Sequence, residues 1–343
     1  MTLKHNYFFL LFVISLKLSL LPEGEASKVF QLSWPTPNPS FAKGMGYSTF
    51  LQKTGPDKAY SSGAFGCVRN SGYKFHEGVD LYPIKRDKSG RAIDSVYAAM
   101  NGVVSYVNST SSYSAYGKYI VIEHFNTRPS LYSLYGHLAS VQENVKVGSE
   151  VNVAQKIGVM GNTASYLIPH SRAHLHFEVG LRLTDNFQSW YDKKDFKSKN
   201  RHGNYSGFNL VGLDPLPFYT TYKRETFHSP LDYLKALSPE VKVRIKTNKI
   251  PDFAERYPSL IRTMPKGKHW NGWDCVFGPF GFPISLQQTD LCTDENENIK
   301  VISYDQLNLE RKCRRLIERK NGKIVPADQL KIYLELIFGQ KIV

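Results

Sequence analysis

The 343-residue sequence lacks several patterns that would assign it to a class at once. Beyond its N-terminus no segment is apolar enough to span a bilayer, no internal repeat is found, and no basic and aromatic motif of the RNA- or DNA-binding kinds occurs. No Cys-x-x-Cys pair is present, so a cysteine-based zinc site has little support. No His-Glu-x-x-His helix is present, so the mechanism that uses the glutamate of that motif as a base has no candidate.

The one long apolar run lies at the N-terminus. Lys4 precedes "YFFLLFVISL", and "LPEGEAS" supplies a small-x-small site that ends at Ala26. The pattern is typical of a secretory signal peptide, so we expect residues 1–26 to be removed on export. The apolar run before Lys17 is ten residues long, well short of the about 20 residues that a membrane-spanning helix needs. The mature chain is therefore expected in the periplasm, the cell envelope or the medium, without a transmembrane segment.

Acidic residues are scarce relative to basic ones. The chain has 30 Asp and Glu against 44 Lys and Arg, which gives a net charge of +14. An exported basic protein suits an anionic polymeric partner such as a cell wall or a membrane surface. Nucleic acid is the rival partner, but export argues against it. Protein partners are not indicated by the sequence.

Cysteine is also sparse, with four residues, at Cys67, Cys275, Cys292 and Cys313. An oxidising compartment permits two disulfides, and three connectivities are then open. In each of them Cys67 pairs with a cysteine more than two hundred residues away. Full oxidation would join the C-terminal region to the N-terminal one, and the alternative is four reduced, buried thiols.

The texture of the chain changes three times. Residues 27–69 are rich in Pro, Ser, Gly and Lys, which predicts an extended lead-in that packs on a neighbouring domain. Residues 70–220 hold short apolar or alternating runs between glycine turns, which predict a mainly β domain with a sandwich or barrel-like arrangement. Within it, residues 184–213 form a polar surface insertion that either lines a groove or is a passive loop. Residues 221–343 are expected to form a smaller α+β region of unknown role.

Patterns in this last region predict particular elements. "VKVRIK" predicts a strand, and "SYDQLNLERKCRRLIERKNG" predicts a helix that starts at a Ser303–Gln306 capping box and stops at Asn321. Pro326 is expected to begin a second helix through "ADQLKIYLELIFG". An aromatic cluster forms either a buried, disulfide-held core or a sugar-binding platform: Trp270, Trp273, Phe277, Phe280 and Phe282.

Histidines and one aspartate mark a candidate metal site. Alternate side chains of a strand point the same way, so His174 and His176 of "AHLHFEV" share one face. In "FHEGVD", the glycine between His76 and Asp80 lets the backbone bend, so that both side chains can converge on one ion. His137 of "LYGHL" adds another imidazole. Zinc binds such nitrogen and oxygen ligands, and three protein ligands leave one position for water.

The motifs carry a family resemblance. In order, "FHEGVDLY", "VYAAMNGVVSYV", "YGKYIVIEH", "LYSLYGHL", "VKVGSEVNVAQKIGVMGNT", "AHLHFEV" and "DPLPFY" resemble the lysostaphin/LytM-type zinc peptidoglycan endopeptidases over roughly residues 70–220. The resemblance implies antiparallel sheets with an open groove, one zinc ion in the catalytic domain, and a peptide cross-link of peptidoglycan as substrate. No organic cofactor is implied.

The resemblance also implies a role for each polar residue of the motifs. His76, Asp80 and His176 match the zinc ligands, and His137 and His174 match the two unligated catalytic histidines. His170 and Tyr135 are further candidates for the substrate groove. Two acidic residues, Glu77 and Glu178, adjoin ligands; we expect them to point to the opposite face of the strand and to serve outside catalysis, and we expect His124 to be structural.

Three whole-protein hypotheses follow. The first is an exported zinc endopeptidase of peptidoglycan. The second is a non-catalytic wall-binding or amidase-activating protein on the same scaffold, which is disfavoured because all five ligand and catalytic positions are filled. The third is a latent enzyme whose groove is covered by the lead-in or the C-terminal region.

Overall fold

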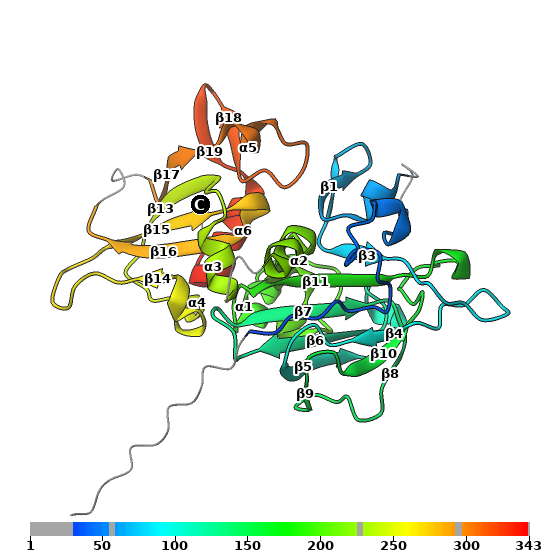
Figure 1. Cartoon of the computed structure of the whole chain (residues 1–343). Coiled ribbons are helices and arrows are strands. Elements are labelled where there is room, and N and C mark those ends of the chain that lie inside the picture. Colours follow the sequence, from blue (N-terminus) through cyan, green and yellow to red (C-terminus); the bar gives the residue numbers. More distant parts are fainter. Residues whose placement is uncertain (1–29, 55–58, 225–228, 292–296, 342–343) are drawn as a thin grey trace, which may run out of the picture.

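A computed structural model describes residues 30–54, 59–224, 229–291 and 297–341 (Figure 1). The expected signal peptide, residues 1–26, and Cys292 lie outside the described residues. Across those ranges, no helix is both long and apolar enough to cross a membrane.

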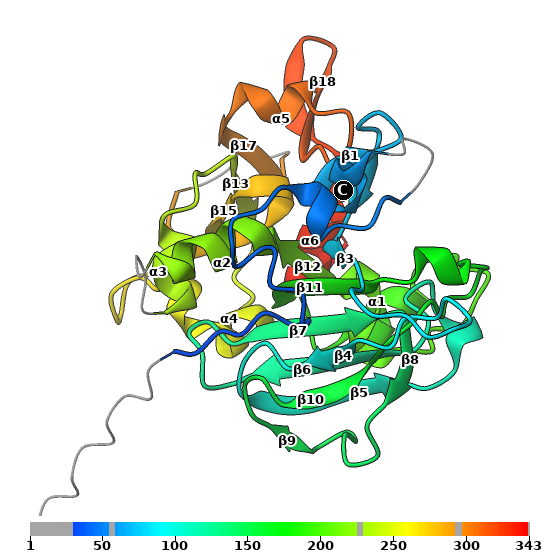
Figure 2. The same ribbon diagram turned by 45° about the vertical axis from the view of Figure 1, so that its right-hand side comes forward.

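The segment of residues 66–213 is mainly antiparallel β-structure, as predicted for residues 70–220. Its strands are β1 (Gly66–Arg69), β2 (Lys74–His76), β3 (Val79–Leu81), β4 (Ser95–Tyr97), β5 (Gly102–Asn108), β6 (Tyr119–His124), β7 (Leu131–Gly136), β8 (Leu138–Val141), β9 (Glu150–Val151), β10 (Lys156–Met160), β11 (Leu175–Arg182) and β12 (Leu210–Leu213). A seven-stranded sheet has the order β12-β11-β7-β6-β5-β9, and β3 pairs with β11 beside it. A three-stranded sheet, β4-β10-β8, packs with it (Figure 2).

The central strands are buried on both faces, which explains their continuous apolar sequence. In β6, Ile120 and Ile122 belong to the main core, whereas Tyr119 and Val121 belong to a second cluster on the other face. Alternate side chains of one strand thus enter two different cores. Tyr205 of the insertion packs against the second cluster, so the insertion covers that face of the sheet.

The insertion is more ordered than a surface loop. Helix α1 (Phe187–Asp192) buries Phe187 and Trp190, and β12 extends the main sheet at its end. The passive-loop alternative is therefore wrong for these parts, because their apolar side chains are needed to cover the sheet and the C-terminal region.

The lead-in runs along the β domain, past helix α2 (Pro215–Lys223), as the blue trace in Figure 2 shows. Trp34 stacks on Phe41 with 4.3 Å between ring centroids and meets Tyr219 of α2 edge-on. The amide of Gln52 donates to the carbonyl oxygen of Asp80 at 2.8 Å. The lead-in therefore packs on the β domain and is hydrogen-bonded to the strand that carries Asp80.

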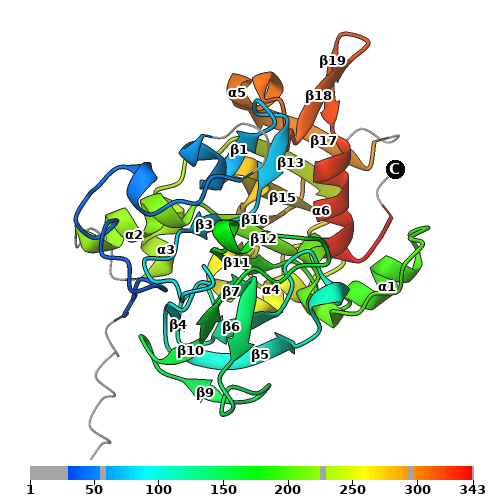
Figure 3. The same ribbon diagram turned by 90° about the vertical axis from the view of Figure 1, so that its right-hand side faces the viewer.

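The C-terminal region is α+β. Its five-stranded sheet has the order β14-β16-β15-β13-β17, and a hairpin and several helices complete it. The elements are β13 (Val241–Lys246), β14 (Ile261–Arg262), β15 (Gly272–Phe277), β16 (Pro283–Thr289), β17 (Ile299–Tyr304), β18 (Ile317–Lys320), β19 (Lys323–Pro326), α3 (Pro230–Lys235), α4 (Asp252–Arg256), α5 (Gln306–Glu310) and α6 (Asp328–Phe338). Helix α6 lies beside α1 (Figure 3), where the indole nitrogen of Trp190 donates to Glu335 at 3.1 Å.

Two of the expected C-terminal elements differ. The strand "VKVRIK" is confirmed as β13, but the long helix expected from Ser303 is only the five residues of α5. The chain then enters the β18–β19 hairpin, whose turn holds Asn321 and Gly322 at positive φ angles of 50° and 78°. Asn-Gly is a strong hairpin signal, and it outweighs the helical spacing upstream. Helix α6 is present but begins at Asp328, after Pro326 has ended β19.

The structure distinguishes between the alternatives for the cysteines and for the aromatic cluster. Cys67 and Cys313 form a disulfide across a sequence separation of 246 residues, whereas Cys275 is buried with a free thiol. Trp273, Phe277 and Phe282 are buried core residues. The cluster is therefore core and not a platform, and packing rather than a disulfide at Cys275 holds it.

Candidate active site

Three side-chain atoms form a small triangle where β3 pairs with β11 of the main sheet. The Nε2 atom of His76 lies 3.1 Å from Oδ1 of Asp80 and 3.1 Å from Nδ1 of His176, and the third edge is 3.0 Å. The three side chains come from the end of β2, from β3 and from β11. All are buried, with exposed fractions of 0%, 1% and 4%.

Strand register brings these residues together. In the pairing of β3 with β11, Asp80 stands directly opposite His176. The link between β2 and β3 passes so close to β11 that a Cβ on Gly78 would lie 2.2 Å from the carbonyl oxygen of Phe177. Only glycine allows this approach, so the Gly of "HEGVD" is what lets the His76 and Asp80 side chains meet.

The hydrogen bonds of the two histidines determine which nitrogens face each other. His76 donates through Nδ1 to the carbonyl oxygen of Ala64 at 2.7 Å, which leaves a lone pair on Nε2. His176 contacts Oε1 of Glu178 through Nε2 at 2.9 Å, and donation there leaves a lone pair on Nδ1. Two nitrogen lone pairs and a carboxylate oxygen thus meet at one point, and a cation or a proton must separate them.

The triangle fits zinc. Tetrahedral zinc with ligand bonds of about 2.0–2.1 Å holds its ligand atoms about 3.3 Å apart, close to the edges observed here. Without a metal ion, burial lowers the pKa of His176, but the Asp80 and Glu178 carboxylates outweigh it and raise the pKa to about 9. A metal ion and a proton therefore compete for the same nitrogen.

Two neighbours hold the side chains of the triangle in place. Arg69 of β1 donates to the second carboxylate oxygen of Asp80 at 2.5 Å. Burial acts to raise the pKa of Asp80, but His76, His174 and Arg69 lower it to well below its ordinary value. Tyr132 donates to Glu178 at 2.8 Å. These contacts orient the Asp80 carboxylate and the His176 imidazole, as partners of metal ligands commonly do.

The placement expected for Glu178 is wrong. Glu178 is two residues from His176, so both side chains lie on the same face of β11 and bond to each other. Glu77 does point elsewhere, toward Arg314 of the C-terminal region at 3.2 Å.

His137 and His174 lie beside the triangle. Each donates through Nδ1 to a backbone carbonyl, of Thr163 at 2.7 Å and of Arg172 at 2.8 Å, so each keeps an unprotonated Nε2. Their ring centroids are 4.6 Å apart, and Nε2 of His174 lies 3.6 Å from Oδ1 of Asp80. Burial is the main cause that lowers the pKa of both, for His137 to well below its ordinary value.

The backbone of His137 is unusual. It links β7 to β8 with a φ of 58°, in the left-handed region that few non-glycine residues adopt. Strained residues of this kind are often found at functional sites because the surrounding structure must hold them. In this conformation the ring of His137 lies next to that of His174.

A cavity opens onto this cluster. It is lined by His137 and His176, by the loop before β6, by the insertion and by the C-terminal region. The lining residues from these three segments are Ser112, Tyr113, Ser114, Ala115, Tyr116, Tyr191, Ser198, Lys199, Asn200, Arg201, His202, Ser206, Gly207, Phe208 and Arg314. The insertion thus lines the cavity, which is the first of the two roles considered for it.

The two groove candidates from the sequence do not line this cavity. His170 is exposed on a short 3-10 helix (His170–Arg172). Tyr135 is fully buried, and its hydroxyl accepts from the amide of Ala99 at 2.7 Å. In the β7–β11 pairing Tyr135 stands opposite Phe177 and faces the core, whereas Gly136 stands opposite His176. The expectation for Tyr135 is therefore wrong.

Sequence reasoning missed Arg69, Tyr116 and Arg314. The ring of Tyr116 lies 5.2 Å from that of His176, between centroids. Arg314 comes from a segment more than two hundred residues away from His76. Tyr116 begins the motif "YGKYIVIEH", so the sequence could have pointed to it. No local pattern marks Arg69 or Arg314 as site residues, because tertiary packing alone brings these two to the site.

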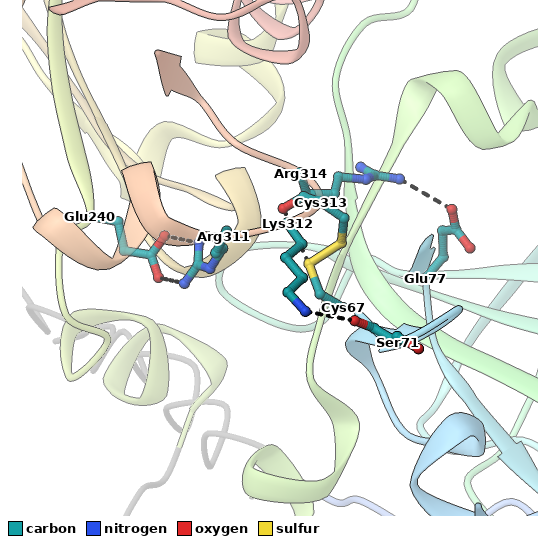
Figure 4. Close-up of a disulfide and its surroundings, with 8 residues drawn as sticks. All are labelled: Cys67, Ser71, Glu77, Glu240, Arg311, Lys312, Cys313 and Arg314. Carbon is teal, nitrogen blue, oxygen red and sulfur yellow. Dashed lines mark hydrogen bonds and ion pairs between the residues drawn. A yellow bond between two sulfur atoms is a disulfide. The ribbon is translucent and has the colours of Figure 1, made fainter. Parts of the chain in front are cut away.

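A short C-terminal segment clamps the β1–β2 hairpin (Figure 4). In this segment Cys313 is bonded to Cys67, and Lys312 donates to the carbonyl oxygen of Ser71 at 3.2 Å. Arg314 pairs with Glu77 and lies over the ring of Phe75, 4.2 Å from its centroid. We call residues 311–314 the clamp segment.

The clamp segment is fixed on its own side as well, because Arg311 pairs with Glu240 just before β13. It therefore connects the C-terminal sheet to a hairpin that carries both His76 and Arg69 (Figure 4).

The fold and the site together describe a mainly antiparallel β domain with a buried His-Asp-His cluster at a cavity. Residues 74–187, about a third of the chain, match the model of peptidase family M23. The family resemblance of the sequence motifs is thereby confirmed for this segment. No curated protein matches the chain.

Solved structures show partial similarity. A zinc-containing peptidase from Vibrio cholerae is 29% identical over 38% of this chain and 31% of that one, with a TM-score of 0.25. The catalytic domain of the antimicrobial peptidase lysostaphin from Staphylococcus simulans is 22% identical over 51% of this chain and 95% of that one, with a TM-score of 0.29. Csd3 from Helicobacter pylori is 20% identical over 58% and 42%, with a TM-score of 0.29.

Proposed function

We propose that the protein is an exported zinc endopeptidase that hydrolyses peptide cross-links of peptidoglycan. The observation that carries the proposal is the triangle of two nitrogen lone pairs and one carboxylate oxygen with edges of 3.0–3.1 Å. His76, Asp80 and His176 would hold the ion. A zinc ion bound by three protein ligands lowers the pKa of water towards neutrality and polarises a carbonyl.

The chain's own residues supply proton transfer. His137 and His174 are neutral and present an unprotonated Nε2 beside the triangle, so either can take a proton from the attacking water. Once protonated at Nε2, the same imidazole is a donor and can return the proton to the leaving amine. While it holds the proton it also stabilises the oxygen on which charge gathers as the amide carbonyl becomes tetrahedral.

Supporting contacts keep this geometry fixed before the reaction. Arg69 holds the outer oxygen of Asp80, and Glu178 holds the outer nitrogen of His176. The carbonyl groups of Thr163 and Arg172 fix the tautomers of the two free histidines. Such preorganisation lowers the cost of reaching the productive arrangement.

A non-catalytic wall-binding or activating protein is the second candidate. It is less favoured because ligand and catalytic positions all hold the required residue types. The latent form is less favoured because the C-terminal region lines the cavity through Arg314 rather than filling it, so that His137 and His176 still face the cavity.

The test is digestion of isolated peptidoglycan by the purified mature protein, with and without a chelator, followed by analysis of the muropeptides. We expect loss of cross-linked dimers that the chelator abolishes and zinc restores. A His170→Ala variant is the matched control, since it removes an exposed histidine that does not line the cavity and should cut normally. Intact dimers despite bound zinc would reject the enzyme in favour of the activator or latent form.

A further inference from the structure

The cavity beside His137 and His176 carries a local excess of positive charge. Five basic side chains and one acidic side chain, Glu77, line it. The basic residues are Arg69, Lys74, Lys199, Arg201 and Arg314. The whole chain has 44 basic and 30 acidic residues, so a ratio of five to one exceeds what the overall charge accounts for. A concave site of one sign concentrates ligands of the opposite sign.

Two of these cations already have partners at the site. Arg69 pairs with Asp80, and Arg314 pairs with Glu77. The remaining three are exposed, and in the described parts of the chain no carboxylate pairs with them. Lys74 comes from β2, two residues before His76, while Lys199 and Arg201 come from the insertion. The unpaired charge thus comes from two segments that are distant in sequence.

Arg201 is held in position before any ligand arrives. Its guanidinium lies over the ring of Tyr113, 4.4 Å from the centroid. The next residue, His202, donates through Nε2 to the carbonyl oxygen of Tyr113 at 2.9 Å and accepts from the hydroxyl of Tyr106 at 2.9 Å. A guanidinium fixed in this way offers a planar pair of donors that matches a carboxylate, at a lower entropic cost than a free side chain.

We propose that the cavity binds a free carboxylate of the peptide substrate next to the scissile bond, with Arg201 as the main contact and Lys74 and Lys199 as supporting charges. The inference rests on the proposed function in so far as the bound peptide is taken to be the substrate. It identifies the substrate class as an acidic peptide cross-link, as opposed to a neutral glycine bridge or an amidated peptide. The insertion that supplies Arg201 and Lys199 therefore determines specificity.

The experiment compares two synthetic cross-linked peptide dimers that differ only in carrying free carboxylates or carboxamides. Binding to the full-length mature protein is measured by fluorescence anisotropy at low and moderate salt, and hydrolysis is followed in parallel. We expect the acid dimer to bind at least tenfold more tightly than the amide dimer. Arg201→Gln should remove most of that ratio, and Arg201→Lys should restore part of it, since lysine keeps the charge but not the paired donors.

Lys197→Gln is the matched control. Lys197 lies on the same insertion, but it does not line this cavity, so its loss should leave the ratio unchanged. Equal binding of both dimers to the wild-type protein would overturn the inference, as would equal effects of Arg201→Gln and Lys197→Gln. Stronger competition by a polyanionic glycerol phosphate polymer than by the acid dimer would also overturn it, in favour of a polymer-binding surface.

Failure of the inference and failure of the proposed function are distinguishable. If both dimers are cleaved and bound equally, the enzyme stands and the carboxylate contact is rejected. If the acid dimer binds selectively but neither dimer nor peptidoglycan is cleaved, the binding site stands and the endopeptidase is rejected.

Discussion

His174 and His176 are two residues apart and face the same side of the sheet, yet their hydrogen bonds differ. A backbone carbonyl fixes His174 through Nδ1, whereas a carboxylate contacts His176 through Nε2. The ring nitrogen that this partner does not engage is therefore Nε2 in His174 and Nδ1 in His176. These different partners are consistent with the roles proposed for the two histidines, proton transfer for His174 and metal binding for His176.

Substitutions of His174 and of His176 should therefore impair the protein in different ways. His176→Ala should lose both zinc and activity, because it removes one of three ligand atoms. His174→Ala should keep about one zinc ion per chain but lose roughly 10²- to 10⁴-fold in turnover, the usual contribution of a general acid or base. Metal analysis and peptidoglycan digestion check both results. Activity that persists in His176→Ala, or zinc lost from His174→Ala alone, would contradict the assignment.

Proton release on zinc binding follows from the raised pKa of His176. Since this pKa is about 9 in the metal-free protein, the ring is protonated at pH 7 and must lose a proton for Nδ1 to bind zinc. We expect about one proton released per zinc at pH 7, and an affinity that rises with pH until about pH 9. Calorimetry at pH 7 in two buffers of different ionisation heat measures the release.

Glu178→Gln is the matched variant for this experiment, because it removes one of the two carboxylates that raise the pKa of His176. The affinity should then level off at a lower pH than in the wild-type protein. Identical heats in both buffers at pH 7 would show that no proton is displaced and would reject the proposed state of His176.

Sequence motifs were sufficient to name the clustered residues but not their surroundings. The histidines and Asp80 lie in short motifs whose order along the chain is informative. By contrast, which nitrogen is free depends on the carbonyl of Ala64 and on Glu178, and Tyr135 was misplaced because the β7–β11 register is not visible in the sequence.

At the scale of helices and strands, the long helix expected from Ser303 was wrong because two local sequence signals favoured different structures there. Ser303 and Gln306 have the spacing of a capping box, but helix α5 starts at Gln306 and is capped by Asp305, whose side chain accepts from the amide of Leu307 at 2.9 Å. The helix ends after five residues, where Arg311 adopts a non-helical conformation with ψ of 139°, and the downstream Asn-Gly pair forms a tight hairpin turn in place of a helix stop. Strands with alternating burial, such as β13, were easier to predict because their period is short and regular.

Ionisation of Asp214, the N-cap residue of helix α2, should lower the stability of the folded protein. Asp214 caps this helix by accepting from the amide of Leu216 at 3.0 Å, and burial raises its pKa to about 6. A raised carboxyl pKa in the folded state means that stability falls as the pH rises from about 4 to 6 and stays reduced above that range. The total effect is on the order of 3 kcal/mol, since one pKa unit corresponds to about 1.4 kcal/mol.

Asp214→Asn should remove this cost. Asparagine keeps the capping oxygen and cannot ionise, so the variant should be more stable than the wild-type protein by about 1–3 kcal/mol at pH 7.5 and no more stable at pH 4. Thermal unfolding at both pH values measures the difference. Asp305→Asn, in the same capping geometry on α5, is the control and should change little. An equal gain for Asp214→Asn at both pH values would contradict the electrostatic explanation.

At the scale of the whole molecule, the C-terminal region is part of the site rather than an appendage. It contributes Arg314 to the cavity, and its clamp segment fixes the hairpin that carries His76 and Arg69. The disulfide partner of Cys67 was open in the sequence, because three connectivities satisfied the same spacing. Only the packing of β1 against the clamp segment selects Cys313.

Loss of the Cys67–Cys313 disulfide should weaken zinc binding as well as stability. The loop between the two cysteines is long, so a Cys67→Ser/Cys313→Ser variant should lose about 2–5 kcal/mol of unfolding free energy. Zinc affinity should fall at least tenfold even where the variant is folded, because the released hairpin carries one ligand and the arginine that orients another. Denaturant unfolding and zinc titration with a competing chelator measure the two effects separately.

The control is Cys275→Ala, which alters a buried free thiol in the C-terminal core and should reduce stability without changing zinc affinity. Treatment of the wild-type protein with a thiol reductant should reproduce the weaker zinc binding, and the double-serine variant should not respond to it. If zinc affinity instead falls in proportion to stability in the double-serine variant, in Cys275→Ala and in the reduced wild-type protein, the hairpin is not positioned by the disulfide. If zinc affinity falls only when Cys67 and Cys313 are separated, the C-terminal region controls the metal site through the β1–β2 hairpin.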